Sequence, residues 1–104
     1  FEQRAEAIME EFGLWQARHL FPHAYSRGMR LKLGLALALI RPFEVLLLDE
    51  PSSALDSEST ELLSNKLVEL AAAGSAILLT THDLHFSNQL DAVQWNIRDG
   101  SIAF

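Results

Sequence analysis

Apolar residues recur at helical spacing at the start of the chain. Four of them lie on one face of a helix: Ala5, Ile8, Met9 and Phe12. Gly13 follows them and suits a C-terminal cap, whereas residues 14–25 are less regular and are interrupted by Pro22. The pattern predicts an amphipathic helix that ends near Gly13, followed by an irregular connection.

The stretch from Leu31 to Leu39 fits two periodicities. Leucine occupies every second position, which is typical of a strand. Leucine and alanine are nevertheless strong helix formers, and residues that favour strands are almost absent. We therefore expect a buried helix that is capped by Ser26 and stops near Arg41–Pro42. Three small residues in it would allow close packing: Gly34, Ala36 and Ala38.

Two short apolar runs, each followed by polar residues, predict strands. Val45–Leu48 leads into Asp49-Glu50-Pro51, and Ala76–Thr81 leads into His82-Asp83. Because both runs are apolar, we expect them to be buried on both faces of a parallel sheet.

The remaining segments complete an α/β layout. Asp56 or Ser57 can cap a helix that runs to about Ala73 and ends at Gly74, and a short helix can start at Asp83. Asp99-Gly100, between residues 92–97 and 101–104, is typical of a hairpin turn. We expect mostly parallel strands with helices packed on the sheet and a C-terminal β-hairpin.

Length and composition indicate one folded domain. The chain has 104 residues, of which 49% are hydrophobic and 21% charged. It has no cysteine, which excludes a disulfide scaffold, a thiolate zinc site and a cysteine nucleophile. Its longest apolar run, Leu31–Ile40, contains Lys32 and is too short to span a membrane. The first residue is Phe1 rather than Met, so we expect the natural start to lie upstream.

Charge is unevenly distributed. The net charge is −6, but residues 1–41 carry +2 and residues 42–104 carry −8. Binding to nucleic acid needs clustered cations that neutralise phosphates, so we expect no nucleic-acid partner.

Polar side chains follow both predicted strands. Asp49 and Glu50 come after the first strand and His82 after the second. Ligands of α/β proteins bind at this edge of the sheet, where one carboxylate can hold Mg²⁺ and another can orient a water. Either set taken alone also fits ordinary loop residues. A metal site built from His82, His85 and Asp83 lacks a third well-spaced ligand.

The start of the leucine-rich helix is a second candidate site. Residues 25–29 read Tyr-Ser-Arg-Gly-Met, which places Ser26 and Gly28 at a helix N-terminus where free N–H groups can bind an anion. The alternative is a capped helix with solvated cations.

The order and spacing of these motifs resemble the C-terminal half of the ATP-binding domain of ABC transporters, over nearly the whole chain. Tyr25–Met29 is similar to the family's signature motif, Val45–Glu50 to its Walker B strand, Ser53–Asp56 to its D-loop and His82 to its switch histidine. The resemblance implies a single partial P-loop NTPase-like domain, with a helical signature region at 1–41 and an α/β part at 42–104.

The resemblance also implies ATP and Mg²⁺ as cofactors. Asp49 would help to hold Mg²⁺, Glu50 would polarise the attacking water and His82 would contact the γ-phosphate. The signature residues would touch ATP held by a second, head-to-tail subunit: Ser26, Arg27, Gly28 and Met29. Asp56 would communicate across that interface. Transmembrane permease subunits would be further partners, and the domain would lie in the cytoplasm at the inner face of the membrane.

Two departures from the family pattern stand out. Arg27 and Met29 replace a Gly and the Gln of the usual Leu-Ser-Gly-Gly-Gln motif. The sequence also contains no G-x-x-x-x-G-K-[ST] phosphate-binding loop, because neither Lys32 nor Lys66 follows a glycine, and it has no glutamine loop. We therefore expect the isolated chain to hydrolyse little or no ATP. We also expect it to self-associate through an exposed sheet edge.

Two other functions fit the residues. One is a non-catalytic module that keeps the fold as an interaction surface. The other is a small Mg²⁺-binding, receiver-like or phosphatase-like α/β domain, which would need further carboxylates beside Asp49 and Glu50, with Asp83 the only nearby candidate.

Overall fold

The computed structural model describes residues 2–103, apart from the side chain of Pro22. The N-terminal part is helical. It consists of α1 (Glu2–Glu11), two short 3₁₀ turns, η1 (Trp15–Ala17) and η2 (Pro22–Ala24), and α2 (Arg27–Leu39). The predicted helices at both ends of this part are confirmed.

The second part alternates strands and helices. It contains β1 (Val45–Asp49), α3 (Ser57–Ala72), β2 (Ala76–Thr80) and α4 (Leu84–Gln89). The hairpin of β3 (Asn96–Arg98) and β4 (Ser101–Ala103) closes the chain. The predicted α/β class is confirmed, including the parallel strands and the terminal hairpin; Phe104, which the sequence placed in that hairpin, lies outside the described residues.

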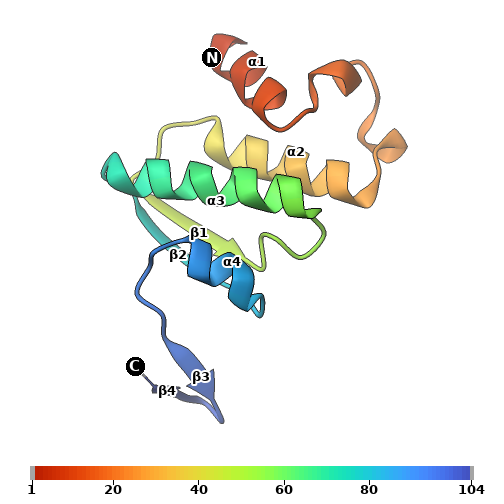
Figure 1. The fold of residues 1–104 in the computed structure, drawn as a ribbon. Coiled ribbons are helices and arrows are strands. Elements are labelled where there is room, and N and C mark those ends of the chain that lie inside the picture. Colours follow the sequence, from red (N-terminus) through yellow and green to blue (C-terminus); the bar gives the residue numbers. More distant parts are fainter. Residues whose placement is uncertain (1, 104) are drawn as a thin grey trace.

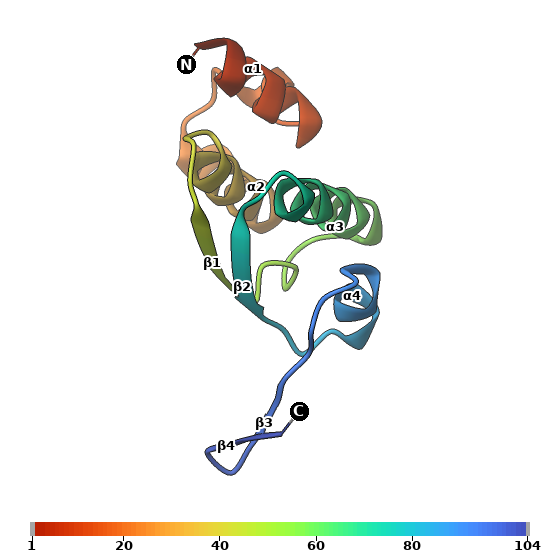
Figure 2. The same cartoon turned by 90° about the vertical axis from the view of Figure 1, so that its left-hand side faces the viewer.

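The parallel pair β1–β2 is covered by helices on one side. Its register pairs Leu46 with Ile77 and Asp49 with Thr80. Helices α2 and α3 lie side by side on one face, and α1 packs on the far side of α2 (Figures 1 and 2). The parallel register brings the C-terminal ends of both strands to the same edge, where the candidate residues follow.

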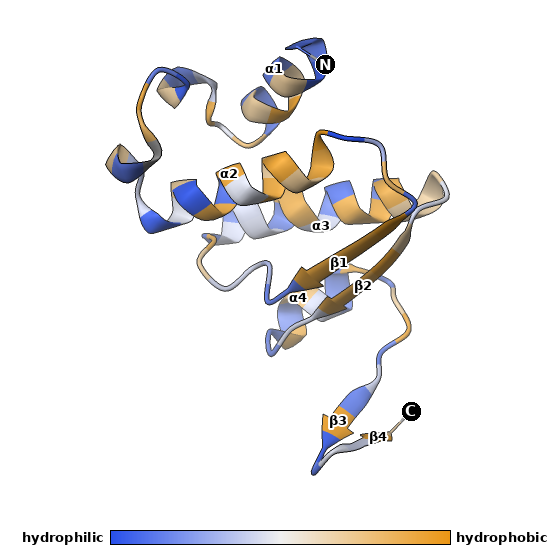
Figure 3. Ribbon diagram, turned by 180° about the vertical axis from the view of Figure 1, so that it is seen from behind, coloured by the Kyte–Doolittle hydropathy of each residue, from blue (hydrophilic) through white to orange (hydrophobic). Residues whose placement is uncertain are grey.

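The other face of the sheet is bare, which corrects the expectation of strands buried on both faces. Val45 is 61% exposed, Leu47 69% and Leu78 60%. Figure 3 shows this side, with both apolar strands in view and no helix across them. The apolar composition of the two runs predicted parallel strands correctly. It does not reveal whether the chain itself supplies helices that cover the second face of the sheet.

The core lies between the helices and the covered face of the sheet. Its fully buried members include Leu14 from the connection, Leu63 from α3 and Phe86 from α4. Tyr25 is also buried, and its hydroxyl donates to the carbonyl of Ala17 over 2.8 Å, so the irregular connection is tied into the core. An ion pair of 3.2 Å between Lys66 and Glu11 joins α3 to α1.

The packing of α2 differs from the prediction. Leu35, Ala36 and Leu39 are buried, whereas Leu37 is 63% exposed. Of the three small residues, only Ala36 is packed; Gly34 and Ala38 are exposed, and a Cβ on Gly34 would meet nothing within 4 Å. The helix therefore presents one buried stripe rather than a fully buried surface.

The hairpin projects from the body of the molecule (Figure 2), and residues 91–103 are exposed throughout. None of the helices in residues 2–103 is both long and apolar enough to cross a bilayer.

Candidate functional site

The first group of candidate residues lies where β1 ends. Asp49 is the last residue of the strand, and Glu50 follows with a φ of 47°. This left-handed conformation is uncommon for a residue with a side chain. It turns the chain sharply out of the sheet, so that two consecutive carboxylates lie at the same edge. Unusual backbone conformations of this kind concentrate at functional sites.

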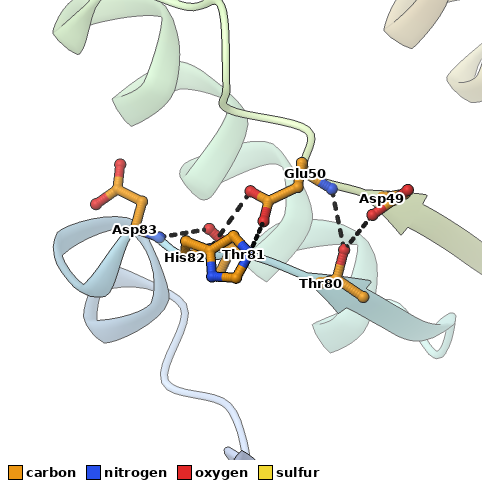
Figure 4. A network of polar contacts seen from close by, with 6 residues as sticks. All are labelled: Asp49, Glu50, Thr80, Thr81, His82 and Asp83. Carbon is orange, nitrogen blue, oxygen red and sulfur yellow. Dashed lines mark hydrogen bonds and ion pairs between the residues drawn. The ribbon is translucent and has the colours of Figure 1, made fainter. Parts of the chain in front are cut away.

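Thr80, at the end of β2, holds both acidic residues. Its hydroxyl donates to Asp49 Oδ1 over 2.5 Å and accepts the backbone N–H of Glu50 over 3.1 Å (Figure 4). The same N–H also donates to the carbonyl oxygen of Thr80 over 3.0 Å. The left-handed residue is therefore anchored by two acceptors on the neighbouring strand.

Glu50 in turn meets His82. Its Oε2 accepts the backbone N–H of His82 over 3.3 Å, and its Oε1 lies 3.3 Å from the ring Nε2. The His82 side chain is 99% exposed, whereas that of Glu50 is 32% exposed. The carboxylate is thus fixed by the loop after β2, while the imidazole, apart from its contact with Glu50, is exposed to solvent. The two residues that the sequence assigned to one site do face each other (Figure 4).

Asp83 and His85 do not join them in a metal site. The Asp83 carboxylate accepts the N–H of Phe86 over 3.1 Å as the N-cap of α4, and His85 contacts Gln89. Within residues 2–103, no three His, Asp or Glu side chains gather closely enough to hold a metal ion. The idea of a His82–His85–Asp83 site is therefore not supported.

The second group lies at the start of α2. Ser26 is its N-cap and accepts the N–H of Met29 over 3.1 Å. Gly28 packs so closely on the segment after β1 that an added Cβ would lie 3.2 Å from the carbonyl oxygen of Ala54. The N–H groups of Arg27 and Gly28, at the first positions of the helix, have no acceptor within the helix and can therefore donate to an anion.

Asp56 lies beside this second group. It is the N-cap of α3, and its Oδ1 accepts the N–H of Ser59 over 2.8 Å. That bond, a further one from the Ser59 hydroxyl and a smaller attraction from Lys32 hold the pKa of Asp56 below its ordinary value of 3.8. The expected helix cap is therefore present, and Lys32 ties it electrostatically to α2.

The candidate residues thus form two clusters on different elements. One contains Asp49, Glu50 and His82, and the other contains the Ser26–Met29 turn with the 54–56 segment. In residues 2–103 no hydrogen bond or ion pair joins the two. A hollow of about 490 Å³ between the start of α3 and α4 includes Asp83 and His85 but none of the three residues of the first cluster. Asp49 and Thr80 instead line a smaller hollow of about 240 Å³ along the two strands, and the Asp49 side chain is exposed to solvent.

The carboxylate pair fits a magnesium ion. Mg²⁺ prefers oxygen ligands, keeps several waters and is usually held by one or two carboxylates together with substrate phosphates. Asp49 is exposed, and Thr80 occupies a lone pair on only one of its two oxygens. The residues present therefore match a cation that is shared with a phosphate ligand, rather than one enclosed by protein.

Comparisons with known proteins give a consistent picture. A family model described as "AAA domain, putative AbiEii toxin, Type IV TA system" matches residues 11–88. The macrolide export ATP-binding/permease protein MacB of Wolinella succinogenes is 38% identical over 101 residues, which are 97% of this chain and 16% of that protein. The octopine permease ATP-binding protein P of Rhizobium meliloti is 36% identical over 99 residues, 95% of this chain and 38% of that protein. The chain thus spans about one sixth of the first relative and under half of the second.

Two solved structures share the fold. One is the ADP conformation of an ATP-binding cassette of an ABC transporter, with a TM-score of 0.64 and 23% identity over 86% of this chain and 35% of that one. The other is an SMC ATPase, with a TM-score of 0.60 and 18% identity over 79% of this chain and 53% of that one. The fold therefore matches part of an ATP-binding cassette and part of an SMC ATPase. The chain belongs to the ABC-type ATPases, and to the AAA-domain family whose model it matches.

Sequence reasoning missed Thr80. The signal was available, because two hydroxyl residues, Thr80 and Thr81, stand between an apolar strand and His82. A threonine at the end of a strand is unremarkable until the register places it opposite Asp49.

Proposed function

We propose that this chain supplies the catalytic carboxylate, the switch histidine and the signature helix of an ATP-hydrolysing domain that drives transport across a membrane. The observation that carries the proposal is the pair of contacts, both 3.3 Å, between the Glu50 carboxylate and His82 at the C-terminal edge of the parallel strands. The proposal is also supported by the names of the relatives, which describe ATP-binding proteins of export and permease systems.

The roles of the residues follow from their placement. Glu50, held by its backbone and by His82, can accept a hydrogen bond from a water and so orient that water for attack on a phosphate. Asp49 presents an exposed carboxylate oxygen beside it, where it would help to hold Mg²⁺. When bound, the cation would neutralise charge on the phosphate oxygens. The exposed His82 ring can turn its Nε2–H from the Glu50 carboxylate to a γ-phosphate oxygen.

The second cluster would serve a different ATP molecule. Ser26 and the N–H groups of Arg27 and Gly28 form an anion site at a helix start, with Met29 completing the turn. Because no polar contact joins this turn to the carboxylates in the described part of the chain, we propose that it faces ATP bound to a second, head-to-tail subunit. Asp56, which is attracted by Lys32 of the same helix α2, would lie at that interface. Division of the phosphate donors between two subunits would couple hydrolysis to closure.

The wider setting is part of the same proposal. The intact domain would bind ATP and Mg²⁺ and dock on permease subunits at the cytoplasmic face of the membrane. The chain by itself would be inactive, because the printed sequence lacks the loop that cradles the β-phosphate.

A chimera tests the proposal. In the exporter chimera, this chain replaces the matching segment of the W. succinogenes protein, so that a complete ATPase surrounds it. We expect the chimera to hydrolyse ATP, and Glu50→Gln to lower kcat by about 10²–10⁴-fold while ATP binding is retained. Glu44→Gln is the matched control, because Glu44 is exposed at the opposite end of β1. A chimera that folds and binds ATP without hydrolysing it, or an active Glu50→Gln variant, would contradict the proposal.

A further inference from the structure

The structure assigns Thr80 as a positioning residue, whose single hydroxyl sets the orientation of Asp49 for a divalent cation and the backbone of Glu50. This inference rests on the proposed function, because it concerns the same carboxylates. Thr80 closes β2, and the parallel register places it directly opposite Asp49. No other side chain in residues 2–103 is hydrogen-bonded to both acidic residues.

The directions of the two hydrogen bonds are fixed by chemistry. The backbone N–H of Glu50 can only donate, so the Thr80 oxygen accepts it over 3.1 Å. The ionised Asp49 carboxylate can only accept, so the one hydroxyl proton of Thr80 must go to its Oδ1. The hydroxyl therefore donates one hydrogen bond and accepts another, and a side chain that only donates or only accepts would not replace it.

For Asp49, the consequence is a fixed carboxylate plane. With Oδ1 held by Thr80, Oδ2 has no hydrogen-bond or ion-pair partner among residues 2–103 and can face a cation. A hydrogen bond to a ligating carboxylate restricts its rotation, and the loss of such an outer partner commonly weakens metal affinity by about 10–100-fold.

For Glu50, the consequence is the retention of its left-handed backbone. The φ of 47° sends the side chain toward the loop after β2, where both of its oxygens meet His82. The carbonyl of Thr80 shares the same N–H and would keep one bond if the hydroxyl were lost. Removal of the hydroxyl should therefore loosen the site without unfolding the strand pair.

The substitution that isolates the hydroxyl is Thr80→Val, which keeps the shape and the β-branch that suit a strand. Thr80→Ser restores a hydroxyl and serves as the rescue. Thr81→Val is the matched control, because the Thr81 hydroxyl accepts the N–H of Asp83 and contacts neither carboxylate. Asp49→Asn tests whether the cation binds through Asp49 at all.

The first measurement is the affinity of the full 104-residue chain for Mn²⁺, a probe for Mg²⁺, determined by electron paramagnetic resonance. The second is the chemical shift and hydrogen exchange of the Glu50 amide, followed by ¹⁵N NMR. We expect Thr80→Val to raise the Kd for Mn²⁺ about 10-fold or more and to shift the Glu50 amide and accelerate its hydrogen exchange. Thr80→Ser and Thr81→Val should resemble the wild type in both measurements.

The outcomes separate the two claims. If the wild type binds Mn²⁺ through Asp49 but Thr80→Val binds equally well, the role of Thr80 is overturned while the proposed cation site stands. A Glu50 amide that is unchanged in Thr80→Val would also overturn the role of Thr80, whatever the affinity. If the wild type binds no Mn²⁺, or if Asp49→Asn binds it as well as the wild type, the cation site in the proposed function fails, and the inference fails with it.

Discussion

Glu50 and His82 meet through two separate atoms of the histidine: Oε2 accepts its backbone N–H and Oε1 lies beside its ring, each over 3.3 Å. The backbone contact fixes the carboxylate whatever the side chain at position 82, whereas the ring is 99% exposed and supports no packing. We expect His82→Ala in the exporter chimera to lower kcat by about 100-fold, the effect of removing one donor to a developing charge. Its melting temperature should match that of the parent. Steady-state ATP hydrolysis and thermal unfolding check both parts.

The control for this prediction is His85→Ala. His85 is also exposed, follows the same strand and contacts Gln89 rather than either carboxylate. It should leave ATP hydrolysis by the chimera unchanged. Equal rates for His82→Ala and the parent would refute the assigned role of the ring.

Asp56 should make stability depend on pH in the acid range. Its carboxylate caps α3, and the bonds from Ser59 lower its pKa in the folded state. A carboxyl group with a lowered folded pKa stabilises the fold above its unfolded pKa, and this contribution disappears as the pH falls from about 4 through the folded value. Asparagine caps helices about as well but does not titrate. At pH 7 we expect the wild type to unfold at a higher urea concentration than Asp56→Asn. This difference should shrink as the pH falls toward 3.

The matched comparison is Asp99→Asn in the β3–β4 turn, where the residue has a φ of 49° that asparagine tolerates. At pH 7 it should unfold at the same urea concentration as the wild type. A gap between Asp56→Asn and the wild type that stays constant from pH 7 to pH 3 would show that the charge of Asp56 adds nothing to the cap.

ATP hydrolysis by the 104-residue chain alone should not exceed the background rate. Asp49 is exposed and Glu50 partly exposed, and the printed sequence offers no loop for the β-phosphate beside them. We expect the purified wild-type chain and its Glu50→Gln variant to give the same rate of phosphate release. Activity that co-elutes with the wild-type chain and disappears in Glu50→Gln would contradict the expectation.

Local patterns predicted most of the elements, because caps and periodicity are short-range features. Ser26 and Asp56 each accept an N–H three residues later, as expected of N-caps. The alternating leucines of α2 were resolved in favour of a helix because helix propensity outweighed the alternation. The site residues at the two strand ends were found because parallel strands place their C-terminal ends together.

What the sequence did not predict depends on contacts between distant segments. The role of Thr80 needs the register that sets it opposite Asp49, 31 residues away. The close approach of Gly28 to Ala54 and the exposure of Gly34 depend on how α2 lies against its neighbours. The bare face of β1–β2 depends on whether a second layer is present, which apolar composition alone does not reveal.

Leu47 and Leu78 are register partners on that bare face and are 69% and 60% exposed. Val45 extends the apolar surface along the same strand, and in residues 2–103 β1 and β2 pair only with each other, so both carry an unpaired edge. An exposed apolar face beside free strand edges favours association, because burial of apolar surface contributes about 25 cal/mol per Å². We expect the average mass of the isolated chain to rise with concentration in multi-angle light scattering.

Leu47→Lys should suppress that association, since a lysine on an open strand opposes both apolar burial and strand pairing. Leu84→Lys is the matched control, because Leu84 is 74% exposed but lies on α4, away from the sheet face. It should associate like the wild type. A wild-type chain that remains a monomer over a hundredfold range of concentration would show that this face does not self-associate. Equal suppression by both variants would show that the face of β1–β2 is not the specific surface of association.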